Sequence, residues 1–523
     1  MKNSEKTTII IDINDIRYNY QLFRKITKQG DLCIPVLKGN AYGFNYYDVA
    51  HNLLNMEEPQ RSFFIYLVDE GRDLRAHFGN EIENIYCLTG PLKGQEEVFL
   101  RYNIIPVINS LEQLYIWSDF AKKKNEKLKM LIQFNLGLNR SGIQQNEIET
   151  VKNFIDDETN MLDLVMIMGH LGYQYRLNTE LGQKFTTKEF ELFENAYRHF
   201  PGIKRGLLGT EGILKIREGL FEFSRPGTAL YTGQPDDEQE NIFKTAITVT
   251  SSVFLVENTR NLLYVNFGLK HGLSTSYQNG GYVYVGGEKI FAKKVEEKRT
   301  LFEVEHGEKY EGKRALLLGY HNGNYIDGYE FSKLNGSVPE EVLCKVATVD
   351  GDDMIERVVL NGCSDKIRKP KDEIKCVNVA VYNRDGKLEK LTSTVTEIRE
   401  ILEDGGCGYD GEELVKRGDI IGTFPIGYAD GLNRKISYAK MDVFVAIDNE
   451  IVSLPLCGKV PMDQMCFRIP KELKNKVKVG GEIIIIDNGR GVYVDRFCNK
   501  MHLTEEEIFF MIKKSVRIDK NYV

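Results

Sequence analysis

Residues 33–43 read CIPVLKGNAYG, an apolar run that ends in a lysine and then in a turn rich in small residues. An uninterrupted apolar run of this length is typical of a strand buried in a parallel sheet. Lys38 stands at the end of that strand. An amine held there can link covalently to an aldehyde cofactor, so Lys38 is the first candidate for chemistry.

The first 240 residues repeat one unit, a strand followed by a helix. Runs like that of Lys38 end near residues 38, 68, 90, 110, 135, 171, 210 and 227, with amphipathic patterns such as 14–27 and 187–199 between them. Eight such units predict an α/β fold of the (β/α)8 TIM-barrel type, since a doubly wound sheet rarely needs eight. Barrel enzymes carry their active sites at the carboxyl ends of the strands, where Lys38 lies.

After residue 242 the pattern changes to short strands separated by Gly, Asn and Asp turns, as in SSVFLVENTRNLLYVNFG (251–268). This pattern is typical of all-β structure. We predict a barrel at 1–242, an inserted β-rich module at 243–395 and a C-terminal β-domain at 396–523. FGLKHGL (267–273) resembles IGYADGL (426–432), and similar strands follow each. The inserted module is therefore either a duplicate of the β-domain or a pair of hairpins that share turn chemistry by chance.

The composition argues against several partners. A net charge of −7 offers no basic field for nucleic acid, and no apolar run reaches the roughly 18 residues of a membrane helix. The first six residues are polar and lack the apolar core of a signal peptide, so we expect a cytoplasmic protein. Nine single cysteines and eight scattered histidines predict neither a disulfide framework nor a metal site.

Five motifs, in one order, resemble those of the alanine racemase family, pyridoxal-phosphate (PLP) enzymes built from a barrel and a β-domain. They are VLKGNAYG (36–43), FNLGLNRSG (134–142), SRPGTALYTG (224–233), GTFPIGYADG (422–431) and PMDQ (461–464). The resemblance implies an amino-acid racemase, an isomerase, with pyridoxal 5'-phosphate on Lys38. Alanine is the expected substrate, and serine, ornithine or lysine stay open as alternatives.

Racemisation removes a proton from one face of a carbon and returns one on the other, so two opposed bases suffice. The resemblance implies that Lys38 is one base. It implies that the other is Tyr409, in GGCGYDGEE, nineteen residues before Tyr428.

The resemblance also assigns supporting residues. Arg225 would face the pyridine nitrogen of the cofactor, with His170 holding this arginine. Arg140 and Met462 would bind the substrate carboxylate.

The loops after the seventh and eighth strands suit a phosphate group, because barrel enzymes commonly bind phosphate there. These loops supply Thr210 from one side and Gly227 and Thr228 from the other. The resemblance adds the hydroxyl of Tyr42.

Two positions depart from the family pattern. Gln133 stands where many members have a carbamylated lysine, and Ile508 or Phe509 stands where a tyrosine reaches the phosphate. In the family, the lysine and the tyrosine of one site come from different subunits, so the resemblance implies a homodimer with shared active sites. A PLP-dependent decarboxylase of similar plan and a degenerate PLP-binding regulatory protein remain as alternatives. The first would leave Tyr409 without a purpose, and the inserted region favours the second.

Overall fold

The computed structural model describes residues 6–233, 242–256, 261–349, 352–363, 366–368, 370, 377–385, 387–437, 439–501, 505, 508, 512 and 518–522. The chain divides into two compact units, each described by itself below. The first comprises residues 1–25, 40–59 and 227–366, and the second comprises 26–39, 60–226 and 367–523.

The second unit contains a barrel of eight parallel strands, which confirms the predicted fold. Its strands β2 to β8 follow one another in space in the order of the sequence. Residues 33–36 close the ring, because Cys33 pairs with Ser224 of β8 and Val36 pairs with Phe64 of β2. The strands and the helices of this unit are β2 (Ser62–Ile65), α4 (Val68–Phe78), β3 (Asn84–Cys87), α5 (Glu96–Arg101), β4 (Ile104–Ile108), α6 (Leu111–Lys124), β5 (Leu128–Gln133), α7 (Ile148–Asp156), β6 (Leu162–Met168), α8 (Glu180–Arg198), β7 (Lys204–Gly209), α9 (Thr210–Lys215) and β8 (Phe223–Arg225).

Apolar side chains fill the inside of this barrel, as expected for a ring of eight strands. Alternate residues of each strand point inward, and branched, aromatic and methionine side chains make up most of the interior. The interior is therefore a packed core, which leaves the strand ends and their loops for chemistry. Its buried members are Ile34, Val36, Phe64, Tyr86, Ile105, Val107, Leu131, Met166, Met168 and Phe223.

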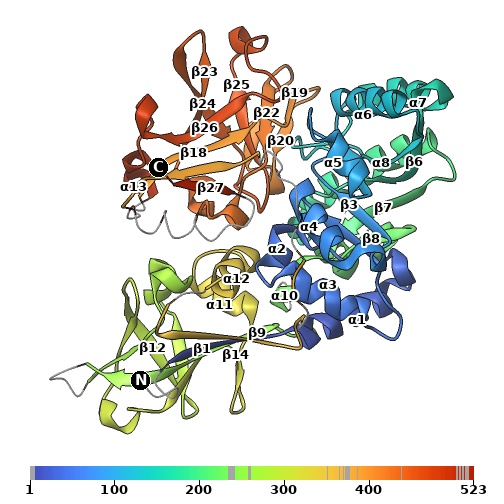
Figure 1. Ribbon diagram of the computed structural model, residues 1–523. Coiled ribbons are helices and arrows are strands. Elements are labelled where there is room, and N and C mark those ends of the chain that lie inside the picture. Colours follow the sequence, from blue (N-terminus) through green and yellow to red (C-terminus); the bar gives the residue numbers. More distant parts are fainter. Residues whose placement is uncertain are drawn as a thin grey trace. The chain divides into compact units, whose positions relative to one another are not determined.

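The first unit contains a β-module, which we call the first β-module (Figure 1, yellow-green strands with the dark blue β1). The first β-module consists of β1 (Thr7–Asp12), β9 (Ile247–Leu255), β10 (Leu262–Val265), β11 (Tyr282–Val285), β12 (Glu288–Val295), β13 (Thr300–Glu303), β14 (Arg314–His321), β15 (Asn324–Ile326), α11 (Gly328–Leu334), α12 (Pro339–Ala347) and β16 (Ile355–Leu360). The same unit also contains the helices α1 (Ile13–Thr27, whose last two residues belong to the second unit), α3 (Tyr46–Leu54) and α10 (Thr228–Thr232).

The C-terminal part of the second unit forms the second β-module (Figure 1, orange and red). It has its own apolar core, to which Leu391, Phe424, Phe467 and Ile483 contribute. Its elements are β17 (Val379–Tyr382), β18 (Leu388–Thr394), β19 (Glu397–Glu400), the hairpin β20 (Gly405–Cys407) and β21 (Glu413–Val415), β22 (Ile420–Phe424), β23 (Asp442–Ile447), β24 (Glu450–Cys457), β25 (Met465–Ile469), β26 (Glu482–Asp487), α13 (Asp495–Met501) and β27 (Asp519–Tyr522).

The two β-modules share one scheme of strand pairing. In the first, β1 pairs with β16 in parallel and with β9 antiparallel, and β9 also pairs with β10 and β14. In the second, β17 pairs with β27 in parallel and with β18 antiparallel, while β18 and β19 together take the place of β9 by pairing with β26 and β22. The remaining antiparallel pairs also correspond, with β10–β13, β12–β13, β11–β12 and β11–β14 matched by β22–β25, β24–β25, β23–β24 and β23–β26.

This pairing moves two of the borders that the sequence suggested. Strand β1 lies in the sheet of the first β-module and not in the barrel, because Thr8 pairs with Thr250 and Thr7 with Ile355. Strands β17 and β18, which precede residue 396, lie in the second β-module. Both differences come from pairing between residues far apart in sequence, which a local pattern of apolar residues does not report.

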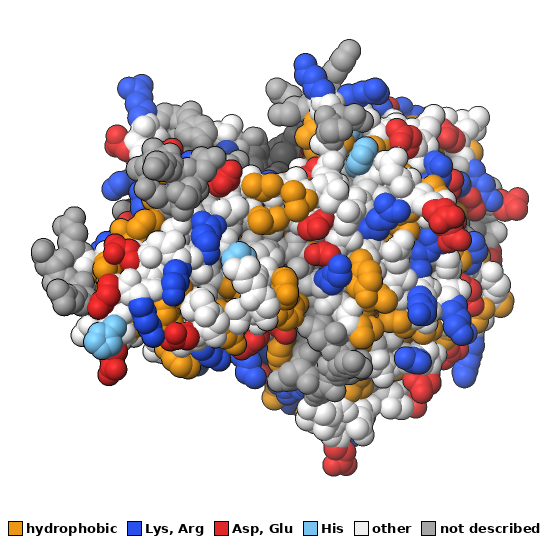
Figure 2. All heavy atoms as spheres, turned by 90° about the horizontal axis from the view of Figure 1, so that it is seen from below, with side chains coloured by type: hydrophobic (Ala, Val, Ile, Leu, Met, Phe, Trp, Pro, Cys, Tyr) orange, Lys and Arg blue, Asp and Glu red, His pale blue; other side chains and the backbone are white. Residues whose placement is uncertain are grey.

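On the face drawn in Figure 2, basic and acidic side chains are interspersed, and neither sign covers a large area. None of the helices in the described part of the chain is long and apolar enough to cross a membrane.

Candidate active site

Lys38 lies directly after the first barrel strand and starts an unusual turn. The strand is fixed by a hydrogen bond of 2.8 Å from the Leu37 N–H to the Phe64 carbonyl. After Lys38, four consecutive residues, from Gly39 to Tyr42, have φ between +52° and +62°. A left-handed turn costs roughly 1–2 kcal/mol for each residue other than glycine. Strain of this kind is concentrated at functional sites, where the surrounding structure holds it in place.

The Lys38 amine is bound by a carboxylate of the second β-module. Its Nζ lies 2.5 Å from Oδ2 of Asp463, a residue that is buried between β24 and β25. The neighbouring Met462 packs against the turn, since a Cβ on Gly39 would come within 2.6 Å of the Met462 Cε. The connection from β24 to β25 therefore contacts this turn twice, by an ion pair to Lys38 and by packing against Gly39.

Tyr409 lies in the longer connection that holds the hairpin β20–β21. One backbone hydrogen bond on each side of Tyr409 joins this connection to a barrel loop. The Gly408 N–H donates to the Leu138 carbonyl at 2.9 Å, and the Asp410 N–H donates to the Gly172 carbonyl at 3.1 Å. The backbone on both sides of Tyr409 is thereby held at the barrel mouth.

The hydroxyl of Tyr409 is hydrogen-bonded to His170, with 2.7 Å between the oxygen and Nε2. Burial, followed by the charges of Arg140, Arg225 and Lys38, holds the pKa of His170 well below its usual range. The imidazole is therefore neutral at physiological pH and can accept a proton through one ring nitrogen.

Arg225 is bound at the end of β8 by groups of the barrel. It donates to the carbonyls of Gly169 at 2.6 Å and Leu207 at 3.3 Å, and to Sδ of Met168 at 3.1 Å. Burial lowers its pKa to about 10, so it stays charged at neutral pH. His170 was expected to hold this arginine. A hydrogen bond of its side chain goes to Tyr409, and the charge of Arg225 helps to lower the pKa of His170.

Arg140 lies against Tyr409, with the guanidinium carbon 5.1 Å from the ring centroid. Burial opposes its charge, but the charge and hydrogen-bonding interactions with Tyr409 raise its pKa above the ordinary value. Its Nε is buried and has no hydrogen-bond partner among the described residues. A buried cationic donor without a partner is costly, so this atom fits an anionic ligand.

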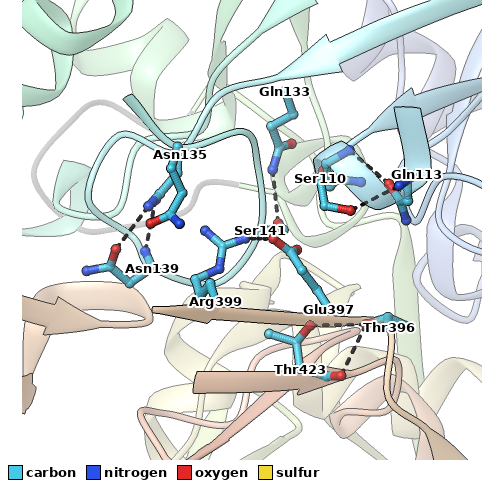
Figure 3. Close-up of polar contacts among 12 residues, drawn as sticks. Ser110, Gln113, Gln133, Asn135, Asn139, Ser141, Thr396, Glu397, Arg399 and Thr423 are labelled. Carbon is cyan, nitrogen blue, oxygen red and sulfur yellow. Dashed lines mark hydrogen bonds and ion pairs between the residues drawn. The ribbon is translucent and has the colours of Figure 1, made fainter. Parts of the chain in front are cut away.

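Gln133 ends β5 in the position where a carbamylated lysine was expected. Its amide donates to the Ser141 hydroxyl at 3.0 Å, one residue from Arg140 (Figure 3). A neutral amide therefore occupies this position. At the other departure, Ile508 is buried in the core of the second β-module, whereas Phe509 lies outside the described residues.

The sequence did not point to Glu397 and Arg399, a buried ion pair on β19 whose side chains turn toward Ser141 in Figure 3. Burial lowers the pKa of Arg399 to about 10, and the charge of Arg140 acts in the same direction. Its Nε and one Nη also lack partners in the part of the chain that the structure describes. One signal in the sequence could have indicated this pair. Glu397 and Arg399 are two residues apart on a strand, so their side chains lie on the same face, and they carry opposite charges.

The other predicted residues lie at helix starts and turns. Thr210 begins α9 after β7, in the second unit. In the first unit, Thr228 begins α10 after Gly227, and its hydroxyl donates to Glu340 at 2.8 Å. Also in the first unit, Tyr42 stacks on Tyr231 at 4.6 Å between ring centroids.

Two models of one protein family match the sequence. "Alanine racemase, N-terminal domain" matches residues 11–235, and "Alanine racemase, C-terminal domain" matches residues 389–520. Together they cover more than half of the chain, which therefore belongs to the alanine racemase family. Most of the first β-module, within residues 236–388, lies outside both matches.

Named relatives and solved structures agree with this family. An alanine racemase of Rickettsia prowazekii (strain Madrid E) is 25% identical over 484 residues, 92% of this chain and 91% of the relative. One of Rickettsia canadensis (strain McKiel) is 30% identical over 294 residues, 54% of this chain and 80% of the relative. The fold is similar to the crystal structure of alanine racemase from Bartonella henselae with covalently bound pyridoxal phosphate. That match has a TM-score of 0.60 at 22% identity and covers 68% of this chain and 99% of that one.

Proposed function

We propose that this chain is a PLP-dependent amino-acid racemase that interconverts L- and D-alanine. One observation carries the proposal. Within a member of the alanine racemase family, Tyr409 bonded to a neutral His170 lies in one site with the amine of Lys38. Alanine enters through the names of the relatives, and serine, ornithine and lysine are the substrates to test beside it.

The residues present suit pyridoxal 5'-phosphate. Lys38 would hold it through its amine, and Arg225 and Arg140 would lie beside its ring nitrogen and phenolic oxygen. For the phosphate, the sequence suggests Thr210, Gly227, Thr228 and Tyr42 as candidates. The buried and unpartnered Nε of Arg140 supports an anionic ligand. When bound, the cofactor withdraws electrons from the attached amino acid and so acidifies its α-proton.

The charges of the site suit a substrate with a carboxylate. Four cations, those of Lys38, Arg140, Arg225 and Arg399, stand against the two carboxylates of Asp463 and Glu397. A site with excess positive charge attracts anions and orients them before reaction. We assign the substrate carboxylate to Arg140, with the backbone of Met462.

The two bases would act through their own partners. A proton taken up by the Tyr409 oxygen can be shared with Nε2 of His170, 2.7 Å away, because that imidazole is neutral. Lys38 would exchange its proton on the opposite face, and Asp463 holds its amine in position. Proton transfer by positioned groups of this kind contributes roughly 10²–10⁴-fold to a rate.

We also propose a cytoplasmic location for this racemase. We further propose the homodimer that the resemblance implies. A second chain is not required to bring Tyr409 to the barrel. Tyr409 already meets His170 within one chain.

The first experiment combines a spectrum with a chiral assay. The protein is incubated with PLP and each L-amino acid, and D-isomers are measured by chiral chromatography. Lys38→Ala should lose the visible absorbance of the linked cofactor and all turnover, whereas Lys93→Ala, at an exposed lysine, should lose neither. A covalent PLP adduct at full occupancy in Lys38→Ala would assign the cofactor to another lysine.

Tyr409→Phe tests the direction of proton transfer. In deuterated water this variant should still exchange the α-proton of the D-isomer through Lys38, and should exchange that of the L-isomer only slowly. The exposed Tyr493→Phe is the matched control and should behave as wild type. Equal exchange of both isomers in Tyr409→Phe would move the second base elsewhere.

A further inference from the structure

The two β-modules differ in the connection that carries Tyr409. In the second module, residues 401–419 join β19 to β22 and hold the hairpin β20–β21. In the first module, residues 256–261 join the corresponding strands β9 and β10. These six residues read VENTRN and include no tyrosine, so this connection has no counterpart of Tyr409 in its sequence.

The two modules also differ in the connection that reaches Lys38. Their hydrogen bonds correspond, because the Leu269 N–H donates to the Glu296 carbonyl as the Tyr428 N–H donates to the Pro461 carbonyl. Counting on from these matched carbonyls, the first module has Glu297 and Lys298 where the second has Met462 and Asp463. The same alignment makes Thr300 the counterpart of Met465, the residue that opens the next strand in each module.

This substitution reverses the chemistry of the position. Where Asp463 attracts the amine of Lys38, Lys298 would repel it, and Glu297 would repel a substrate carboxylate. The first module thus lacks both groups that a β-module brings to this site. It is a duplicate in strand pairing that has kept none of the site chemistry.

The second module meets the barrel of its own chain at several further points. Nζ of Lys188 on α8 lies 2.6 Å from the Glu403 carboxylate, and Arg176, in the loop before α8, lies 2.7 Å from that of Glu412. The Asn139 amide donates to the Gly406 carbonyl at 2.9 Å. All three contacts are made by residues of the connection that carries Tyr409, and they all lie within one compact unit.

We propose that each chain contains one complete active site, closed by its own second β-module, which takes the place that a partner subunit's β-domain would otherwise fill. The first β-module is a non-catalytic copy. The solved relative from Bartonella henselae aligns over 99% of its length with only 68% of this chain, as an additional module would require. The term active site rests on the proposed function, whereas closure within one chain does not.

A carbodiimide cross-link tests closure without any activity. This reagent joins an amine directly to a carboxylate in contact with it, and both Lys188 and Glu403 are solvent-accessible. Chains labelled with ¹⁴N and ¹⁵N are mixed, unfolded, refolded together and cross-linked, and the joined peptides are identified by mass spectrometry. Lys474 with Glu400, an ion pair inside the second module, serves as the internal control, and Glu403→Gln should remove only the Lys188 product.

Closure within one chain gives Lys188–Glu403 peptides that are wholly ¹⁴N or wholly ¹⁵N. Closure between chains would make about half of them isotopically mixed, because partners reassociate at random. Mixed peptides at that level would overturn the proposal.

Complementation gives a second, independent result. Lys38→Ala and Tyr409→Phe, refolded together, should show no more racemase activity than the sum of the two alone. Recovery of about a quarter of the wild-type activity would instead require sites shared between chains. If wild type is inactive before it is unfolded, the proposed function fails, while the isotope result still decides where the site closes. Refolded wild type is the reference against which the activity of the mixed variants is measured.

Discussion

The two β-modules have the same ladder of strands but different chemistry. The turn at residues 268–272 of the first module also corresponds to the turn at residues 427–431 of the second. In the first turn the Gly268 N–H donates to Nδ1 of His271 at 3.0 Å, and in the second the Gly427 N–H donates to the Asp430 carboxylate at 2.9 Å. Each turn then closes through a glycine in the left-handed region, Gly272 or Gly431. Either a histidine or an aspartate therefore satisfies the same backbone donor.

The differences lie at the site. Phe254 of β9 and Val256, the residue after its end, correspond to Glu397 and Arg399 of the second module, because both sets face corresponding residues of the next strand. Backbone pairing therefore sets the fold, and the connections together with a few strand positions set the function. Exchanging these parts between the modules tests whether the function can be changed while the fold is kept.

The largest effect should follow from replacing residues 401–419 by the first module's VENTRN. The pairing of β19 with β22 should persist, as it does for β9 with β10, but Tyr409, the proposed base, is removed. We expect racemisation to fall by about 10³-fold while the absorbance of the cofactor on Lys38 remains. Chiral chromatography and visible spectroscopy measure the two, and Tyr409→Phe should reproduce most of the loss. Near-normal racemisation in the exchanged chain would show that the base lies outside this connection.

The next effect concerns stability. Arg399→Val leaves the buried Glu397 without its partner, and Glu397→Phe leaves Arg399 buried beside Arg140. Each change should cost about 3 kcal/mol, whereas the double change to the first module's residues should cost less than either. Urea unfolding of all four proteins completes the cycle. Additive losses would mean that the two side chains do not form an interacting pair.

A smaller effect is expected at Asp463. Asp463→Asn keeps the shape of the side chain but removes the charge that binds Lys38. Loss of one charge-assisted hydrogen bond should lower kcat/KM by about tenfold, and Asp463→Lys, which gives this position the charge that Lys298 has in the first module, should lower it further. Steady-state kinetics against the exposed control Asp448→Asn decides this. Unchanged kinetics in Asp463→Asn would remove that residue from the site.

The smallest effect is a dependence of stability on pH. Glu189 on α8 accepts a hydrogen bond from the Gly172 N–H at 2.7 Å, in the loop whose carbonyl binds the Tyr409 connection. Burial raises the pKa of Glu189 to about 8, against hydrogen bonds from the backbone that lower it. Between the ordinary pKa near 4.5 and this value, the folded chain holds a proton that the unfolded chain has lost. The free energy of unfolding therefore decreases as pH rises through this range.

Glu189→Gln should remove this dependence, because an amide stays neutral at every pH. Its Tm should exceed that of wild type by about 2 °C at about pH 8.5 and differ little at about pH 5. Glu191→Gln, an exposed neighbour on the same helix, is the control. Parallel Tm curves for wild type and Glu189→Gln would mean that Glu189 is already charged in the folded protein.

Local sequence predicted the barrel well. All eight apolar runs became strands at the expected places, since short periodic segments carry their own signal. The helix predicted at 14–27 appears as α1, and the one predicted at 187–199 is the second half of α8. Lys38 is bound to Asp463 of the second β-module, and Tyr409 is bound to His170 of the barrel, but the role of Lys38 and Tyr409 as a pair of bases stays a prediction.

What the sequence left out depended on contacts across long separations. Asp463 was passed over beside Met462, because no motif indicated that its carboxylate would bind a lysine 425 positions away. Glu397 and Arg399 resembled ordinary charges on an exposed strand edge. Both are buried in the folded chain, where the charge of Arg140 acts on Arg399, and no local pattern reports this.

The pairing of β1 with β16 has a consequence for synthesis on the ribosome. Strand β1 is made first, yet its parallel neighbour begins only at Ile355. At a rate of synthesis of roughly 5–20 residues per second, β1 (TTIIID) is without its parallel neighbour for about 20–70 s. During this time its edge is open to wrong partners, and β27 pairs in the same parallel manner with β17. The nascent chain should therefore depend on chaperones to cover β1 until Leu360 has emerged.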